Sequence, residues 1–547
     1  MISANQSQWR SLRRWIFAIL LICALMRFFN LGIKPYWYDE VYTSLRLSGY
    51  TKVDIFERFG TEQGYFKDLK NFQCPSNDRD LGDVLNGLIT DDIHPPLYFT
   101  LLYYWTKIGG CSISHLRLFS ALSSLLLILI SYVFVYEIFN SREIALLTTV
   151  LVTNSPIFLI YAQEARHYIL LMLLALASSV TLLRYLDGKT LEKQEDISSK
   201  GEHFPASSKK YPKDFKNLSI YCFLSTAGLY CHTLYYLVIM GQVGYCFFKP
   251  VQKSNTTFSL IDLINNLISN IRLNKNIFIA ILLSFLGFLI WIFRVINLKG
   301  FEISVGADYT WKEFPLGILW QRIALNFTSL INDFDSEIKS EILTKNVISY
   351  SLSSLSFSHI LIILLICSTF LFSIWYMIQY SDRSRTVLLA WMALPSVLFL
   401  IKDLLLGGSA SSIIRYQLLS VFGLYTSLSF CLIHLFKFTS LKWVKGFVIA
   451  LIFLLCQMQI NSNIHYLNAS TWWSKYGDYR LPEFARSVNQ SSYPIILGEA
   501  DYREMVNLLK LSYILSPSVP FKLVKEEELS KNSLNLNSHN IFWIPKI

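Results

Sequence analysis

Three ionisable side chains, Glu164, Arg166 and His167, interrupt the apolar stretch "LIYAQEARHYIL" at residues 159–170. A charged side chain at the centre of a bilayer costs roughly 2.5–3.5 kcal/mol even on the most lenient scale. In membrane proteins such residues usually face the interior of the helix bundle and mark a functional site. The stretch therefore predicts a polar site at one end of a membrane-spanning helix.

Similar side chains stand next to other apolar runs, in "KPYWYDEVY", "DDIHPPLYF", "YCHTLYY" and "IIRYQLL". These candidates, with the tyrosine of "ARHYIL", are Asp39, Glu40, Asp92, His94, Tyr168, His232, Arg415 and Tyr416. A carboxylate can act as a general base, and the planar guanidinium group of arginine matches phosphate oxygens. Each residue alone also has a structural interpretation, as a solvated loop, a helix cap or a snorkelling anchor. Only the whole set predicts a site for an anionic headgroup.

The composition is that of a membrane protein with several spans. Of the 547 residues, 53% are hydrophobic and 16% are charged, whereas a soluble domain carries about 25% charged residues. The net charge of +11 does not indicate a nucleic-acid partner, because lysine and arginine collect on the cytoplasmic side of membrane proteins.

Twelve apolar runs approach the length of about 20 residues that a membrane-spanning helix needs. They are roughly 15–33, 95–109, 115–137, 143–160, 166–186, 217–231, 233–248, 276–297, 357–380, 386–402, 416–436 and 444–461. No small-residue cleavage site follows the first run, which is expected to be a retained anchor. The run 95–109 is short, opens on two prolines and is rich in tyrosine, so we expect it to lie at the membrane interface. Eleven spans remain, which puts the N-terminus in the cytoplasm and the C-terminus outside.

The polar, lysine-rich segment 187–216 is expected to be an unstructured cytoplasmic loop. With eleven spans, all the candidate residues fall on the opposite, outer face. The first outer loop (34–110) carries interfacial helices, and a second outer loop (298–356) is the expected lid or acceptor-contact region. The sequence thus predicts an all-α polytopic transmembrane domain over residues 1–461 and a small extracytoplasmic α/β appendage over 462–547.

Two cysteines, Cys74 and Cys111, both fall outside in this topology. An oxidising compartment permits disulfides there. We state as a hypothesis that they form a bond between the first outer loop and the end of the run 95–109.

Several segments resemble the bacterial members of glycosyltransferase family 39, of the GT-C superfamily, and occur in that family's order. They are "YDE", "HPPLYF", "SHLRLFSALSSLL" (114–126), "SPIFLIYAQEARHYIL" (155–170), "GLYCHTLYY" (228–236) and "RYQLLSVFGLY" (415–425). The superfamily includes the protein O-mannosyltransferases and the lipid A aminoarabinose transferase. The likeness covers about residues 12–240 and 385–461.

The resemblance implies a GT-C fold and an enzyme that takes a sugar from a polyprenyl-phosphate donor. The acceptor would lie outside a bacterial inner (plasma) membrane, and one in-line displacement would invert the anomeric centre. By resemblance Asp39 is the catalytic base, and Arg166 and Arg415 contact the donor phosphate. We expect Tyr168 and Tyr416 to bind the donor phosphate as well. The sequence identifies neither the sugar nor the acceptor. The candidate acceptors are a protein, a lipid and a polysaccharide.

A divalent metal also stays open. Glu40, Asp92, His94 and His232 could supply mixed oxygen and nitrogen ligands. Ile93, however, stands where the pattern of the aminoarabinose transferase has an acidic ligand. Related enzymes differ in metal dependence.

Three other functions use the same kind of membrane architecture. A lipid-linked-sugar flippase or polysaccharide transporter would place charges along a path through the membrane and often contains internal repeats. The charges here collect on one face and the two halves show no repeat, which favours the enzyme. An O-antigen-ligase-type transferase would use a diphosphate-linked donor. A non-catalytic scaffold would leave the charged residues unexplained.

Overall fold

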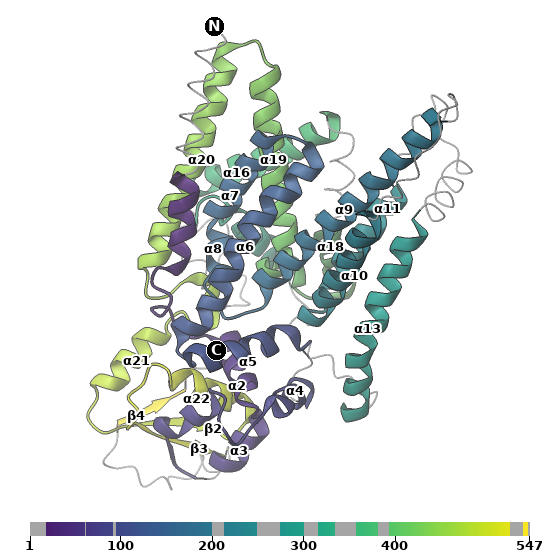
Figure 1. The fold of residues 1–547 in the computed structure, drawn as a ribbon. Helices are drawn as coiled ribbons and strands as arrows, with labels where there is room; N and C mark the ends of the chain where they lie inside the picture. Colours follow the sequence, from purple (N-terminus) through teal and green to yellow (C-terminus); the bar gives the residue numbers. More distant parts are fainter. Residues whose placement is uncertain are drawn as a thin grey trace.

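The computed structural model describes most of the chain. The described residues are 18–60, 62–90, 94–199, 213–248, 274–299, 315–333, 357–380, 393–525 and 540–544. Most of them lie in helices, and a small sheet occupies one end of the molecule (Figure 1).

Short elements build the region from the end of the first predicted span to the start of the second. They are η1 (Met26–Phe28), α2 (Tyr38–Ser48), α3 (Lys52–Phe59), β1 (Gly64–Tyr65), η2 (Phe66–Phe72), α4 (Leu81–Thr90) and α5 (Leu97–Gly109). Helix α5 has 13 residues, which gives it a length of about 20 Å. It is therefore too short to cross a hydrocarbon core of about 30 Å.

Longer apolar helices form the body of the molecule. They are α6 (Ile113–Phe139), α7 (Arg142–Asn154), α8 (Pro156–Ala162), α9 (Tyr168–Ser199), α10 (Lys213–Cys231), α11 (Tyr235–Phe248), α13 (Lys275–Lys299), α14 (Leu316–Thr328), α16 (Phe357–Tyr380), α18 (Leu394–Leu406), α19 (Leu418–Phe438) and α20 (Lys442–Asn468). The short helices η5 (Ala410–Ser412) and η6 (Ile414–Gln417) precede α19.

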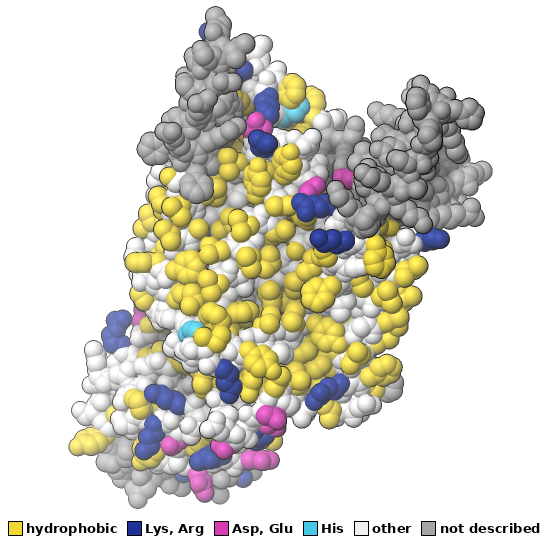
Figure 2. Space-filling view, in the orientation of Figure 1, with side chains coloured by type: hydrophobic (Ala, Val, Ile, Leu, Met, Phe, Trp, Pro, Cys, Tyr) yellow, Lys and Arg dark blue, Asp and Glu magenta, His cyan; other side chains and the backbone are white. Residues whose placement is uncertain are grey.

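Five of the described helices are long and apolar enough to cross a membrane, or six if the bent pair α7–α8 counts as one span. Helices also occupy parts of the other predicted runs. Figure 2 shows hydrophobic side chains across the middle of one face, with charged side chains toward its two ends. A surface embedded in a bilayer needs this distribution. The chain is therefore a multi-pass membrane protein.

The run 143–160, predicted as one span, is a broken helix. Helix α7 ends at Asn154, α8 begins at Pro156, and their axes differ by 61°. Ser155 between them is extended, with φ −62° and ψ 127°, and Pro156 has no N–H group to continue the helical hydrogen bonds. The turn that follows α8, residues 163–167, contacts α2.

The segment 187–216, predicted to be unstructured, is helical in its first part. Helix α9 continues to Ser199, and α10 begins at Lys213. The sequence "LEKQE" (191–195) consists of good helix formers, whose intrinsic preference sustains a helix beyond the membrane. High polarity alone was therefore a poor guide to the structure of this segment.

The C-terminal part of the chain forms a small sheet with helices at the same end of the bundle as α2–α5 (Figure 1). Its elements are η7 (Trp473–Asp478), α21 (Leu481–Gln490), β2 (Pro494–Glu499), α22 (Tyr502–Leu511), β3 (Pro520–Val524) and β4 (Asn540–Trp543). The strand order is β1-β3-β2-β4. Strand β2 pairs in parallel with β3 and β4, while β1 pairs antiparallel with β3, Gly64 opposite Phe521. One strand of the sheet thus comes from the first outer loop.

A single hydrophobic core joins these two distant parts of the sequence. Val41 and Leu45 of α2 belong to the same buried cluster as Ile496 of β2 and Met505 of α22. The tail after α20 is therefore packed onto the first outer loop.

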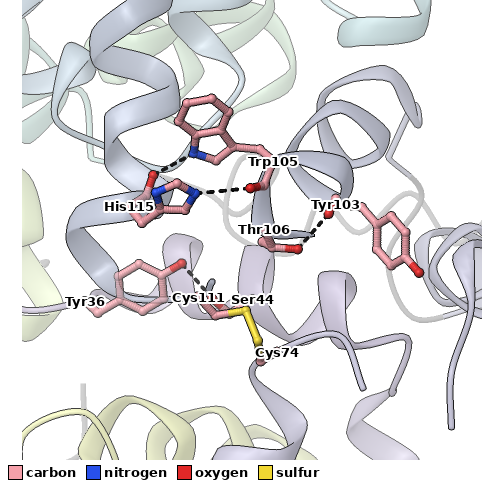
Figure 3. The surroundings of a disulfide bond; sticks show 8 residues. All are labelled: Tyr36, Ser44, Cys74, Tyr103, Trp105, Thr106, Cys111 and His115. Carbon is pink, nitrogen blue, oxygen red and sulfur yellow. Dashed lines mark hydrogen bonds between the residues drawn. A yellow bond between two sulfur atoms is a disulfide. The ribbon is translucent and has the colours of Figure 1, made fainter. Parts of the chain in front are cut away.

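The hypothesised disulfide is present. Cys74, after η2, is bonded to Cys111, after α5, with a Cα–Cα distance of 5.7 Å. Figure 3 shows it beside two reciprocal hydrogen bonds that join α5 to α6: Trp105 Nε1 donates to the carbonyl of His115 (2.9 Å), and His115 Nε2 lies 3.1 Å from the carbonyl of Trp105.

The disulfide predicts the result of a thiol titration. The chain has nine cysteines, and seven of them are free. Ellman titration of the denatured protein is expected to find about seven thiols before reduction and about nine after it. If the denatured protein shows nine thiols before any reductant is added, the disulfide is absent.

Candidate active site

Asp39 lies in the first turn of α2 and faces two arginines from distant segments. Its Oδ2 atom lies 3.3 Å from Nη1 of Arg415, in η6, and 4.0 Å from Nε of Arg166, in the turn after α8. Nη1 of Arg166 also donates to the main-chain carbonyl of Asp39 (3.1 Å) and to the Thr43 hydroxyl (3.4 Å). The three charged side chains keep 18%, 14% and 8% of their surface exposed, for Asp39, Arg415 and Arg166. A small anion could therefore reach them.

The two arginines determine the charge of Asp39. Burial alone would raise the pKa of this carboxyl, but Arg415 and Arg166 outweigh burial, with help from His94 and Lys475. The pKa of Asp39 therefore lies below its ordinary value, as expected for a carboxyl beside opposite charges. Asp39 is a carboxylate at neutral pH.

Three aromatic rings lie close to Arg415. The guanidinium carbon of Arg415 lies 5.6 Å from the ring centre of Trp37, 5.9 Å from that of Tyr168 and 5.6 Å from that of Tyr416. Arg166 lies 5.9 Å from the same Tyr168 ring. Cation–π contacts hold a guanidinium plane without consuming its N–H donors. Tyr168 and Tyr416, which we predict to bind the donor phosphate, therefore lie next to Arg415.

A buried aspartate orders the loop that leads to Arg415. Asp403, at the end of α18, accepts hydrogen bonds from the main-chain N–H groups of Ala410 (3.1 Å) and Ser411 (2.6 Å). The chain reaches these residues through Gly407 and Gly408, whose φ values are +76° and +109°. Only glycine adopts such values at little cost. The approach to Arg415 is thus fixed by one carboxylate and two glycines.

Glu40 is fully buried and held by three groups. Arg117 of α6 donates to both of its oxygens (Nε 2.8 Å, Nη2 2.6 Å), and the N–H of Ala165 donates to Oε1 (2.8 Å). Lys475 lies 3.6 Å from Oε2. Arg117 donates further to three carbonyls of the chain before α2, those of Leu31, Lys34 and Pro35. Glu40 therefore ties the turn 163–167 and the start of α2 to α6. With both oxygens taken, it is poorly placed to be a metal ligand.

Glu164 pairs with Lys475, at 2.6 Å, and not with the neighbouring Arg166. Both side chains are almost completely buried, with 0% and 1% of their surface exposed. Lys475 belongs to η7 and also lies 4.8 Å from the ring centre of Trp37. The tail thus supplies the cation for a carboxylate of the candidate site.

Three imidazole rings lie together beside the charged cluster. The ring centres of His167 and His232 are 4.3 Å apart, and those of His94 and His167 are 6.0 Å apart. Burial, with the positive charges of neighbouring groups, lowers the pKa of His167 and of His232 well below the ordinary value. These two rings are therefore neutral at pH 7, with nitrogen atoms suited to hydrogen bonding.

The histidines and carboxylates do not form a metal site among the described residues. Within that part of the chain, no group of three or more His, Cys, Asp or Glu side chains could hold a metal ion. The predicted ligand Asp92 lies outside the described residues.

The sequence missed two residues of the cluster, Arg117 and Lys475. Arg117 carried a usable signal, because it is a charged residue in the 27-residue helix α6, which is otherwise apolar over most of its length. Lys475 carried none, because it lies in a polar tail where lysines are common. Only the packing of η7 onto α2 brings it to the site.

The middle of the N-terminal half matches a protein family. Residues 93–194 match the family described as dolichyl-phosphate-mannose-protein mannosyltransferase. The match includes the "HPPLYF" and "YAQEARHY" segments, and it confirms the resemblance to GT-C membrane glycosyltransferases of this type. No curated protein sequence matches the chain significantly.

Solved structures with a similar course of the chain are distant in sequence. ArnT from Cupriavidus metallidurans in the apo state has 9% identity and a TM-score of 0.49, over 95% of this chain and 90% of that one. The same protein bound to undecaprenyl phosphate has 9% identity and a TM-score of 0.48, over 92% and 85%. The apo oligosaccharyltransferase of Archaeoglobus fulgidus has 14% identity and a TM-score of 0.42. The matched region spans 92% of this chain but only 64% of that one.

The buried pair Arg117–Glu40 predicts a large loss of stability when it is broken. Arg117→Met leaves Glu40 buried with its main cation removed, which is expected to cost about 3–5 kcal/mol of unfolding free energy. Thermal unfolding of the purified protein in detergent is the measurement.

The matched control is Arg184→Met on α9. Arg184 also contacts a glutamate, Glu137, at 2.6 Å, but 49% of its side-chain surface is exposed. An exposed pair contributes about 0–1 kcal/mol, so the melting temperature should change little. Equal losses in the two variants would contradict the proposed role of Arg117.

Proposed function

We propose that the chain is a GT-C-type membrane glycosyltransferase that takes a sugar from a polyprenyl-phosphate-linked donor. The observation that carries the proposal is the contact of Asp39 with both Arg166 and Arg415, from three separate parts of the sequence. One carboxylate can serve as a base, and two guanidinium groups can stabilise a leaving phosphate. The family match over residues 93–194 supports the same chemistry.

Each group has a distinct part in the proposed reaction. An acceptor hydroxyl attacks the anomeric carbon while Asp39 accepts its proton, a step in which a positioned base contributes about 10²–10⁴-fold. The lipid phosphate leaves on the opposite side, so the anomeric centre inverts. Phosphate is already a good leaving group and needs charge stabilisation more than a proton. Arg166 and Arg415 provide it, because their N–H groups match phosphate oxygens.

The arginines also control the strength of the base. Without a donor they lie against Asp39 and keep its pKa low, which makes the carboxylate a poor proton acceptor. A donor phosphate would share these cations, and the pKa of Asp39 would rise toward its ordinary value. Asp39 would then become a better base only when the sugar is in place.

Two observations support an extracytoplasmic site. The Cys74–Cys111 disulfide belongs to the loop that also carries Asp39, and structural disulfides form in oxidising compartments. The charge distribution of the sequence puts the same loop outside. We propose a bacterial inner membrane, with an acceptor that is a protein, a lipid or a polysaccharide.

The second outer loop is proposed to contact the substrates. Its described part contains α14, and Asn326 of that helix donates to the carbonyl of Ser412 (2.6 Å), three residues before Arg415. The transmembrane part (1–461) would bind the donor, with the loop 298–356 over it. Residues 300–314 and 334–356 lie outside the described residues.

A transporter is less well supported. Among the described residues of α6, α9, α13, α19 and α20, Arg117 is the one charged side chain that is fully buried. A path for a charged headgroup through the membrane would need more polar lining along these helices. An O-antigen-ligase-type reaction would need cations for a second phosphate group.

Asp39→Asn and Arg166→Gln test the proposal directly. In membranes supplied with radiolabelled undecaprenyl-phosphate sugars, Asp39→Asn is expected to lower kcat by about 10²-fold or more, because the amide cannot accept the proton. Arg166→Gln is expected to lower kcat/KM by a similar factor, about 10²–10³-fold.

The control is Arg184→Gln, which removes an exposed arginine far from Asp39 and should keep wild-type transfer. Thermal unfolding must show that all three variants fold. Wild-type transfer by folded Asp39→Asn would exclude Asp39 as the base. Absence of transfer by the wild-type protein with every lipid-linked sugar would refute the proposed function.

The control of base strength by the donor predicts two different pH profiles. The acid limb of kcat/KM reports Asp39 in the free enzyme, and that of kcat reports it with donor bound. Because the free enzyme has the lower pKa, activity is retained to lower pH in kcat/KM than in kcat. Coincident acid limbs would contradict the sharing of the arginines by the phosphate.

A further inference from the structure

We propose that Lys475 and Asp478, in the tail after the last long helix, are positioning residues of the site that contains Asp39. The inference rests on the proposed function for its activity readout. It concerns η7, a segment for which the sequence suggested no role. Both side chains act through α2 and neither contacts the carboxylate of Asp39.

Lys475 contacts two buried carboxylates at once. Its Nζ lies 2.6 Å from Glu164 and 3.6 Å from Glu40, and its side chain is 1% exposed. Glu40 is on α2 and Glu164 is on the turn that carries Arg166. A single cation therefore joins the two segments whose separation sets the distance from Asp39 to Arg166.

Asp478 holds the first turn of α2 from its other side. Its Oδ2 accepts a hydrogen bond from the main-chain N–H of Tyr38 (3.0 Å), one residue before Asp39. The side chain of Trp37, the N-cap residue of α2, makes no capping hydrogen bond. Oδ1 of Asp478 accepts from Lys510 of α22 at 2.6 Å, and both of these side chains are buried. Asp478 thus caps α2 from a segment 440 residues away.

The segment η7 is itself firmly anchored. The indole N–H groups of Trp472 and Trp473 each donate to Asp333 at 2.8 Å, and the N–H of Asp333 donates to the Ser462 hydroxyl on α20 at 2.8 Å. The segment 472–478 therefore connects α2 to the end of α20 through hydrogen bonds at both of its ends. A shift of about 1 Å in a catalytic group can cost about 10²-fold in rate, so loss of either contact should affect catalysis.

The experiment compares Lys475→Met with Lys475→Arg, and Asp478→Ala with Asp478→Asn, in the full-length protein. We expect Lys475→Met and Asp478→Ala to lower kcat about 10–100-fold while KM for the donor changes less than about threefold, because the phosphate-binding arginines remain. Lys475→Arg keeps the charge and should recover most of kcat. Asp478→Asn keeps an oxygen for the Tyr38 N–H but removes the charge that pairs with buried Lys510, so it should recover kcat only in part. The matched control is Lys522→Met, a half-buried lysine on β3 of the same tail.

A second readout does not depend on transfer. Lys475 contributes to the low pKa of Asp39, together with Arg415, Arg166 and His94. Its removal should raise the pH at which dicyclohexylcarbodiimide, which reacts with protonated carboxyls, half-labels Asp39. Peptide mass spectrometry measures this labelling. A merely structural role of Lys475 would leave that pH unchanged.

The outcomes separate the two proposals. Wild-type kcat and wild-type labelling in folded Lys475→Met would overturn the positioning role. Equal losses in Lys475→Met and Lys522→Met would overturn it as well. If the wild-type protein transfers no sugar, the proposed function fails, and the labelling of Asp39 alone decides the role of Lys475. If Lys475→Met does not accumulate, Lys475→Gln replaces it in both measurements.

Discussion

Two carboxylates with no exposed surface, Glu40 and Glu164, depend on two buried cations, Arg117 and Lys475. A buried charge without a partner is costly, so these contacts cannot be loosened one at a time. Arg117 binds Glu40 through two donors, and Lys475 bridges Glu40 and Glu164. The start of α2, the turn after α8 and the tail are therefore held in one arrangement. This arrangement fixes the position of Asp39 in the first turn of α2.

The arrangement divides the charged groups into two layers with different surroundings. Glu40, Arg117, Glu164 and Lys475 are buried and form ion pairs with one another. Asp39, Arg166 and Arg415 keep some exposed surface, and their balance of one negative and two positive charges favours the approach of an anion. The inner layer is suited to holding geometry and the outer layer to binding a headgroup. Neutral His167 and His232 beside them add hydrogen-bonding nitrogens without more charge.

The sequence predicted the outer layer well and the inner layer poorly, for a physical reason. Asp39, Arg166 and Arg415 stand at the ends of apolar runs, where a charge is conspicuous, and the topology puts them on one face. The resemblance then suggests their roles. Glu40 and Glu164 were named, but not their partners, because an ion pair between residues hundreds of positions apart leaves no local pattern. The same limit hid the strand β1 in the first loop, which exists only because β3 lies beside it.

Local rules also failed where tertiary context or propensity opposed them. Hydropathy predicted one span over the run 143–160 but not the bend of 61° at Pro156, where α7 gives way to α8. Polarity suggested an unstructured segment after residue 187, although its residues are good helix formers and α9 continues to Ser199. The strand and helix patterns after residue 461 predicted a small α/β region. Its shared core with α2 could not be, because amphipathic patterns show which face is buried and not what covers it.

The pairing of β1 with β3 and the capping of α2 by Asp478 have a consequence for biosynthesis. Residues near position 40 leave the ribosome long before those near 475 and 520, so their partners do not yet exist while the intervening helices insert. Contacts between residues far apart in sequence form late and slowly. Until the tail is made, Glu40 and Glu164 lack Lys475, and the main-chain N–H of Tyr38 lacks its acceptor on Asp478. The first loop can therefore reach its final packing only when the last hundred residues of the chain have been synthesised.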